Sequence, residues 1–195
     1  PSRRSTLRKK KKKDKDGNII PDRTPKQRKN NIKFTFARYM FAFIREGFGD
    51  LPVWKIAAAQ RGMTDDNLIQ STNYKYLDEK GKILDMEGFQ VSLGPLALPL
   101  NLRATRNGTL VSITWDDPRD EPSAAPTDRM MVGIFYADYR DTFTLEKETG
   151  ATRRDGKCEI ILRDDDGEVC IHPFFARADN TAFSEDKAIT LPDTE

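Results

Sequence analysis

The chain has 195 residues, of which 37% are hydrophobic and 33% charged, and its formal net charge is +2. This size allows one core of ordinary domain dimensions, with residues left over for an appendage. Since no apolar run approaches the roughly 18 residues that cross a bilayer, a transmembrane helix is not expected.

The small net charge hides a strong asymmetry along the chain. Residues 1–33 contain 14 Lys or Arg and three Asp, a net charge of +11, whereas residues 34–195 contain 19 basic and 28 acidic residues, a net charge of −9. A positive end on an acidic body suits the capture of a polyanion, or the electrostatic docking of one copy onto another.

Residues 1–23 contain too few apolar groups to fold alone, so we expect a flexible basic arm. Lysines follow its opening residues where a signal peptide would have an apolar stretch, and we therefore expect a cytoplasmic protein or one within an assembled particle. The arm can bind phosphate backbones without sequence preference, dock on an acidic protein, or have no partner and serve as a solvated tail that aids solubility. Membrane binding is disfavoured because no amphipathic helix accompanies the arm. The cations expected to bind the partner are Arg3, Arg4, Arg8, Lys9, Lys10, Lys11, Lys12, Lys13 and Lys15.

A helix is predicted to begin at the sequence Thr-Pro-Lys-Gln, residues 24–27. Thr24 is a suitable N-cap, Pro25 suits the first helical position, and Gln27 can reach back to complete a capping box. Gly47 and Gly49 are plausible terminators.

This helix is apolar nearly all round, so it needs cover from the following helices, from the strands or from another subunit. The face expected to meet that partner consists of Phe36, Tyr39, Met40, Phe43 and Ile44, which follow a three-and-four spacing. Arg38 and Arg45 share a face near Tyr39, an arrangement that would also suit stacking on nucleic-acid bases. The competing interpretation is that the aromatic residues form core and the cations solvate the outer face.

Two short helices are predicted next, one over residues 53–61 closed by Gly62, and one beginning near Thr64. Residues 73–96 mix turn signals with short β-prone runs such as residues 89–93. Residues 24–97 are therefore expected to be a helical region with short strands.

From residue 98 the pattern changes to regular short strands separated by turn residues. The fold class expected is α+β: the arm and helices precede a seven-stranded antiparallel β-sandwich over residues 98–192, with residues 193–195 as a tail. The expected strands are residues 100–105, 110–115, 130–139, 142–147, 158–162, 169–177 and 188–191.

The strand sequences resemble the fibronectin type III frame. The resemblance rests on Trp115 in the second strand, on the run Met131–Tyr136, and on residues 170–178 with the following Ser184. The whole arrangement over residues 20–192 resembles an uncharacterised bacterial domain family, in which a basic and helical half precedes an immunoglobulin-like half. This resemblance implies the fold and a bacterial or phage origin, but it transfers no activity and no site residues.

The sequence contains no catalytic or cofactor-binding signature. His172 is the only histidine, which excludes a multi-histidine metal site, and it is expected to be a packed histidine of a strand. Cys158 and Cys170 are expected to be buried, reduced thiols. The Asp-rich runs at residues 14–18 and 164–167 fail the EF-hand register, which leaves only weak calcium binding open.

We therefore expect a non-catalytic structural or assembly protein with no cofactor, such as a virion component of a phage or part of another large bacterial complex. Its partners would be neighbouring proteins, including other copies of itself. The alternative is a nucleic-acid-associated protein that binds phosphate backbones through the arm.

Overall fold

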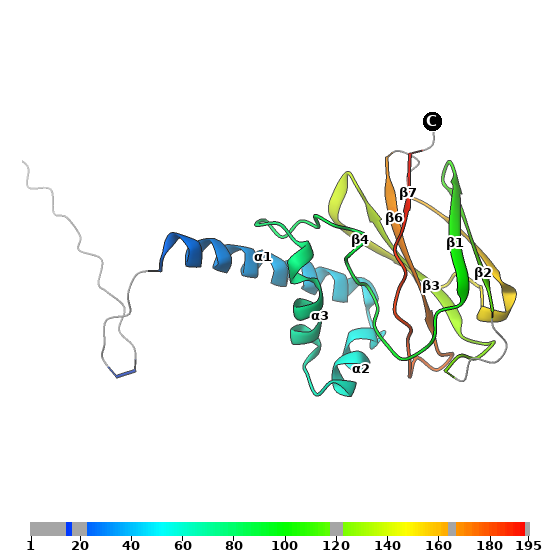
Figure 1. Ribbon diagram of the computed structural model, residues 1–195, viewed down its shortest axis with the longest axis horizontal. Helices are drawn as coiled ribbons and strands as arrows, with labels where there is room; N and C mark the ends of the chain where they lie inside the picture. The colour runs from blue at the N-terminus through cyan, green and yellow to red at the C-terminus, as the bar shows by residue number, and fades with distance from the viewer. Residues whose placement is uncertain (1–14, 17–22, 118–122, 164–166, 194–195) are drawn as a thin grey trace, which may run out of the picture.

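The computed structural model describes residues 15–16, 23–117, 123–163 and 167–193. Within these ranges three α-helices precede seven strands, and the strands form two antiparallel sheets (Figure 1). The mixed α+β class and the seven strands expected from the sequence are confirmed. No helix among the described residues has the length and apolar content required to cross a membrane.

The first helix, α1 (Pro25–Phe48), begins with the predicted capping box. The Thr24 hydroxyl accepts a hydrogen bond from the Gln27 amide at 3.2 Å, and the Gln27 side chain accepts one from the Thr24 amide at 2.9 Å. The helix ends at Gly49, whose φ of 58° favours glycine. Two shorter helices follow, α2 (Val53–Gln60) and α3 (Asp65–Asn73), and Thr64 caps α3 as expected.

Residues 77–99 contain no extended strand, so the short strands expected in this part of the helical region do not form. Only isolated bridges occur, between Leu77 and Ile83 and between Leu96 and Ser184. The backbone of Gln90 instead exchanges two hydrogen bonds, both of 2.8 Å, with the side chain of Asn73. Side chains thus satisfy main-chain groups that a sheet partner would otherwise bind.

The strands form a three-stranded and a four-stranded sheet. The first has the order β1-β2-β5 and the second the order β4-β3-β6-β7. The predicted end of the strand over residues 130–139 is wrong. The strand ends at Tyr136, which already pairs with Tyr139 across a turn at Ala137 and Asp138. The strands are β1 (Leu100–Asn107), β2 (Leu110–Asp116), β3 (Arg129–Tyr136), β4 (Tyr139–Glu146), β5 (Lys157–Ile161), β6 (Val169–Ala176) and β7 (Ile189–Leu191).

The four-stranded sheet is buried on both of its faces. Met130, Val132 and Phe175 belong to a core cluster shared with the three-stranded sheet. Phe135 and Phe174 belong to a second cluster shared with the three helices and residues 77–93. This arrangement explains why β3 and β6 read as nearly continuous apolar runs. Figure 1 shows the helices on one side of the four-stranded sheet and β1 and β2 on the other.

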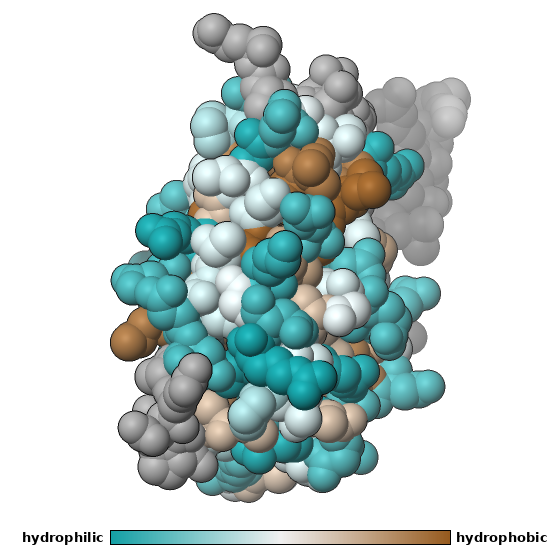
Figure 2. All heavy atoms as spheres, turned by 90° about the vertical axis from the view of Figure 1, so that its right-hand side faces the viewer, coloured by the Kyte–Doolittle hydropathy of each residue, from teal (hydrophilic) through white to brown (hydrophobic). Residues whose placement is uncertain are grey.

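The outer surface beside β1 and β2 is mixed in character. Figure 2 shows a mostly hydrophilic face with a small apolar patch near its upper end. Leu110 and Ile161, which are opposite each other in β2 and β5, are 40% and 76% exposed.

Replacing Asn73 with alanine should destabilise the protein by about 2 kcal/mol, because two partly buried main-chain groups of Gln90 lose their partner. Asn67→Ala is the matched control, since this exposed side chain lies on the same helix, and its effect should stay within about 0.5 kcal/mol. Urea unfolding of both variants measures the difference. Equal effects of the two substitutions would contradict the assigned role of Asn73.

Candidate functional site

The first helix has two distinct apolar faces, of which one is part of the core. That buried face consists of Ala37, Met40, Phe41, Ile44 and Phe48. The ring of Phe48 lies 5.6 Å from that of Phe143 on β4 and 6.4 Å from that of Phe174 on β6, between ring centroids. The carboxyl-terminal half of α1 is thereby fixed against the four-stranded sheet.

The structure buries part of the partner face expected from the sequence and leaves the rest exposed. Met40 and Ile44 are 6% and 0% exposed and pack in the chain's own core, whereas Phe36, Tyr39 and Phe43 lie on the surface. The helix is rotated so that Phe41, which is not a member of that expected face, is also buried. With aromatic residues around most of the helix, three-and-four spacing alone permits more than one apolar face.

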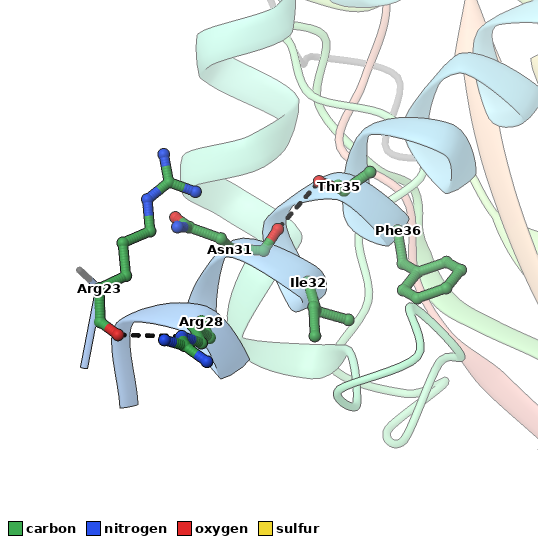
Figure 3. Close-up of a pocket in the computed structure, with 6 residues that line it drawn as sticks. All are labelled: Arg23, Arg28, Asn31, Ile32, Thr35 and Phe36. Atoms are coloured by element: carbon green, nitrogen blue, oxygen red, sulfur yellow. Dashed lines mark hydrogen bonds between the residues drawn. The ribbon is translucent and has the colours of Figure 1, made fainter. Parts of the chain in front are cut away.

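The second apolar face is exposed and consists of Ile32, Phe36, Tyr39 and Phe43, which we call the docking stripe. Successive members are four, three and four residues apart, so all four lie along one side of α1. Their exposed fractions are 53%, 42%, 68% and 40%. Figure 3 shows Ile32 and Phe36 extending from the same side of the helix.

The amino-terminal part of the stripe borders a shallow pocket of ≈ 370 Å³. Its polar rim is held within the chain: Arg28 donates from Nε to the Arg23 carbonyl at 2.9 Å, and the Thr35 hydroxyl donates to the Asn31 carbonyl at 2.9 Å (Figure 3). The apolar members of this pocket, Ile32 and Phe36, remain partly exposed to solvent. Covering them would remove apolar surface from water, which is favourable.

Several cations of α1 already interact with the chain itself. Lys29 forms an ion pair with Glu79, and Lys33 lies over the ring of Tyr74 at 4.5 Å from its centroid. Arg45 forms a hydrogen-bonded ion pair with Asp66. The positive charge of the helix is therefore partly neutralised.

A larger pocket of ≈ 780 Å³ separates α1 from α3. It brings together the three residues considered for base stacking, Arg38, Tyr39 and Arg45. The Asp66 carboxylate lies in the same pocket and binds Arg45. The local charge is thus less favourable to a phosphate than the sequence suggested.

The only histidine lies in a buried cluster with Cys170 and Asp186. His172 and Cys170 are both 0% exposed. Nδ1 of His172 lies 2.7 Å from the Asp186 carboxylate, and Nε2 lies 3.5 Å from the Cys170 sulfur. The other carboxylate oxygen of Asp186 accepts hydrogen bonds from the amides of Val91 and Ser92, at 2.9 and 2.8 Å.

This cluster has the composition of a catalytic triad, but its nucleophile and base are out of contact with solvent. Burial by itself would lower the pKa of His172; the hydrogen bonds to Asp186 and Cys170 and the charge of Asp186 outweigh it and raise this pKa to about 9. Through Asp186, the charged His172 side chain links β6 to the main chain of residues 91 and 92. His172 is thus fully packed within the protein, as expected from the sequence.

Sequence reasoning missed Asp186 as the partner of His172. It lies in a loop after β6 with no motif around it, and only the folded chain brings it to the histidine. The two cysteines, Cys158 on β5 and Cys170 on β6, are free, buried and located in different sheets.

A second buried polar group joins the ends of the two sheets. The Arg153 guanidinium lies over the ring of Phe175 at 4.4 Å, and its Nε is 3.6 Å from the Asp128 carboxylate. Burial lowers the pKa of Arg153, although the charges of Asp128 and Asp117 oppose this effect. The Trp115 indole donates to the Arg153 carbonyl at 2.7 Å, which links β2 to this cluster.

Most of the predicted arm cations, Arg3 to Lys13, lie outside the described residues, as does Asp14 and most of both Asp-rich runs; Lys15 is described. Within the described part of the chain, no three His, Cys, Asp or Glu side chains are grouped so that they could hold a metal ion.

Comparisons with known proteins find only weak structural similarity, over about half of the chain. No family model matches the chain, and no curated protein matches it. The crystal structure of the chicken CNTN1 FN1–FN3 domains is similar over 53% of this chain and 34% of that chain, with 7% identity and a TM-score of 0.38. The solution structure of the fourth FNIII domain of a human protein is similar over 52% of this chain and 82% of that chain, with 18% identity and a TM-score of 0.36. TM-scores this low support no functional inference.

The stability of the protein should depend on the protonation of His172. Because its folded pKa of about 9 exceeds the unfolded value of about 6.5, the contribution is complete below pH 6.5 and is lost as the pH rises through 9. The loss should be on the order of 3 kcal/mol in the free energy of unfolding.

The single imidazole signal in an NMR titration measures this pKa directly, since the chain has one histidine. In urea unfolding, His172→Gln should remove the corresponding part of the decline above neutral pH. A folded-state pKa at or below 6.5 would contradict the assignment.

Proposed function

We propose that this chain is a non-catalytic structural protein that joins a larger assembly by packing the docking stripe of α1 against a neighbouring protein. The observation that carries the proposal is the stripe itself: four large apolar side chains in line on an exposed helix. On soluble monomeric proteins, large contiguous patches of exposed apolar surface mark interaction sites. Amphipathic helices commonly bind partners through side chains at this spacing.

We further propose that the two sheets form a fibronectin type III-like sandwich that supports the helix rigidly. The sheet orders β1-β2-β5 and β4-β3-β6-β7 support this, as does the edge-to-face contact between Trp115 on β2 and Phe175 on β6, with ring centroids 5.5 Å apart. The non-catalytic part of the proposal is supported by the complete burial of His172 and Cys170. We propose a phage particle or another large bacterial complex as the setting. The basis is the resemblance of the sequence to the uncharacterised bacterial domain family and the charge asymmetry of the chain.

The docking stripe can be tested with the double variant Ile32→Ser/Tyr39→Ser. In extracts of the source organism, the wild-type protein should migrate in a complex larger than the monomer, and the variant should leave that complex because its apolar contact is lost. The control is Ile161→Ser, which removes an exposed apolar side chain of the three-stranded sheet.

Both variants should keep a melting temperature close to that of the wild type, since surface changes have small effects on stability. Size-exclusion chromatography with light scattering measures the complex. A stripe variant that remains in the complex, or a wild-type protein that is monomeric in the extract, would contradict the proposed function.

The second candidate is nucleic-acid binding through the arm, which the five consecutive lysines at residues 9–13 favour. Affinity should then fall steeply with salt, with a logarithmic slope of about −0.9 per duplex phosphate contact or about −0.7 per single-strand contact. Deleting residues 1–15 removes nine basic residues and one acidic residue, and should abolish binding while leaving the Thr24 cap intact. Fluorescence anisotropy with and without the deletion tests this; unchanged affinity would eliminate the arm as the binding element.

A further inference from the structure

We infer that the neighbour is a second copy of this chain, and that the two α1 helices pair antiparallel through their docking stripes. This inference rests on the proposed function, since it names the partner of the same surface. Its basis is that the exposed side of α1 is self-complementary, in both its apolar residues and its charges.

The stripe continues by one residue at each end at the same spacing. Lys29 precedes Ile32 by three residues, and Glu46 follows Phe43 by three, so both charged residues lie on the side of the helix that carries the stripe. The complete series has alternating steps of three and four residues, which is the repeat of helices that pack side by side. It reads Lys29, Ile32, Phe36, Tyr39, Phe43 and Glu46.

Antiparallel pairing places each member of this series opposite a favourable partner. A two-fold axis between residues 37 and 38 puts Phe36 opposite Tyr39 of the second copy, and Ile32 opposite its Phe43. The same axis puts Lys29 opposite Glu46 of the second copy. Each contact occurs twice because a two-fold interface repeats every pair.

The charges select this orientation over the parallel one. Parallel pairing would set Lys29 beside Lys29 and Glu46 beside Glu46, and like charges at such positions are destabilising. Glu46 forms no ion pair among the described residues of its own chain, so it is available to a second copy. The existing pair of Lys29 with Glu79 is about 60% exposed on both side chains and holds Lys29 only weakly.

Two other cations of α1, Arg45 and Lys33, are occupied within the chain. Arg45 is bound to Asp66 on the side that faces α3, and Lys33 lies over Tyr74. Arg38 lines the pocket between α1 and α3, which Tyr39 of the stripe also borders. Arg28 lies beside Ile32 and Phe36 on the side of the stripe, and its Nε donates to the Arg23 carbonyl.

The helix is also positioned to make the contact. Figure 1 shows the amino-terminal half of α1 extending beyond the sheets, and Phe43 and Glu46 in the other half are exposed as well. The series from Lys29 to Glu46 is about 27 Å of helix, a short contact beside the interfaces of roughly 1,200 Å² or more that hold stable complexes. We therefore expect a dimer that dissociates on dilution.

Sedimentation velocity of the full-length protein over a wide concentration range tests the inference. The wild type should shift from monomer to dimer with increasing concentration, and Lys29→Glu or Glu46→Lys alone should weaken dimerisation about tenfold, because symmetry reverses two pairs at once. The double variant K29E/E46K should restore the wild-type affinity. Lys55→Glu is the control, with the same type of charge reversal at an exposed residue of α2, and should dimerise like the wild type.

Mixing the two single variants distinguishes the orientations. Lys29→Glu and Glu46→Lys complement each other only in an antiparallel pair, so their mixture should form a heterodimer more tightly than either variant forms a homodimer. A wild type that stays monomeric at all concentrations would overturn the inference, as would single variants that dimerise like the wild type. A third outcome separates the two proposals: the purified wild type is monomeric at all concentrations, but Ile32→Ser/Tyr39→Ser still leaves the native complex in extracts. The partner is then not a second copy, and the docking stripe is still the binding surface.

Discussion

The burial of the four-stranded sheet on both faces is the constraint on which the rest of the structure depends. Strands β3 and β6 project large apolar side chains to both sides, and a single layer of strands cannot cover both. The three-stranded sheet covers one side, and the helices with residues 77–93 cover the other. The helical region is therefore part of the core, because without it Phe135 and Phe174 would face water. The position of α1 follows from this requirement.

The buried polar clusters supply partners for polar groups that this burial removes from water. Strand β6 carries His172 into the layer beneath the helical region, where an unpaired imidazole would be costly. Asp186 supplies the counter-charge, and the carboxylate in turn accepts two hydrogen bonds from main-chain amides of residues 91 and 92. A buried charge pair is tolerable when its remaining hydrogen-bonding capacity is filled in this way. The same contacts hold the irregular segment of residues 89–93 without a strand partner.

The sequence predicted the features that depend on local chemistry. The capping box at Thr24, the cap at Thr64 and the strand positions are set by residues within a few positions of one another, and the structure has them. It did not predict which side of α1 is buried, because aromatic residues on most sides leave several rotations equally favourable by spacing alone. That choice depends on Phe143 and Phe174, more than 90 residues away in the chain. Asp186 was missed for the same reason, since its partners are known only after the strands are paired.

The rotation of α1 is also what gives the helix a surface role. By burying Phe41 and Phe48, the core takes one side of the helix and leaves the stripe from Ile32 to Phe43 without cover. A helix anchored along its carboxyl-terminal half does not have to fold when it meets a partner, so little conformational entropy is lost on association. A modest apolar stripe can then be sufficient for binding, provided that the partner presents the same spacing. A second copy of α1 meets that condition by symmetry, with opposite charges at the two ends of the stripe to set its direction.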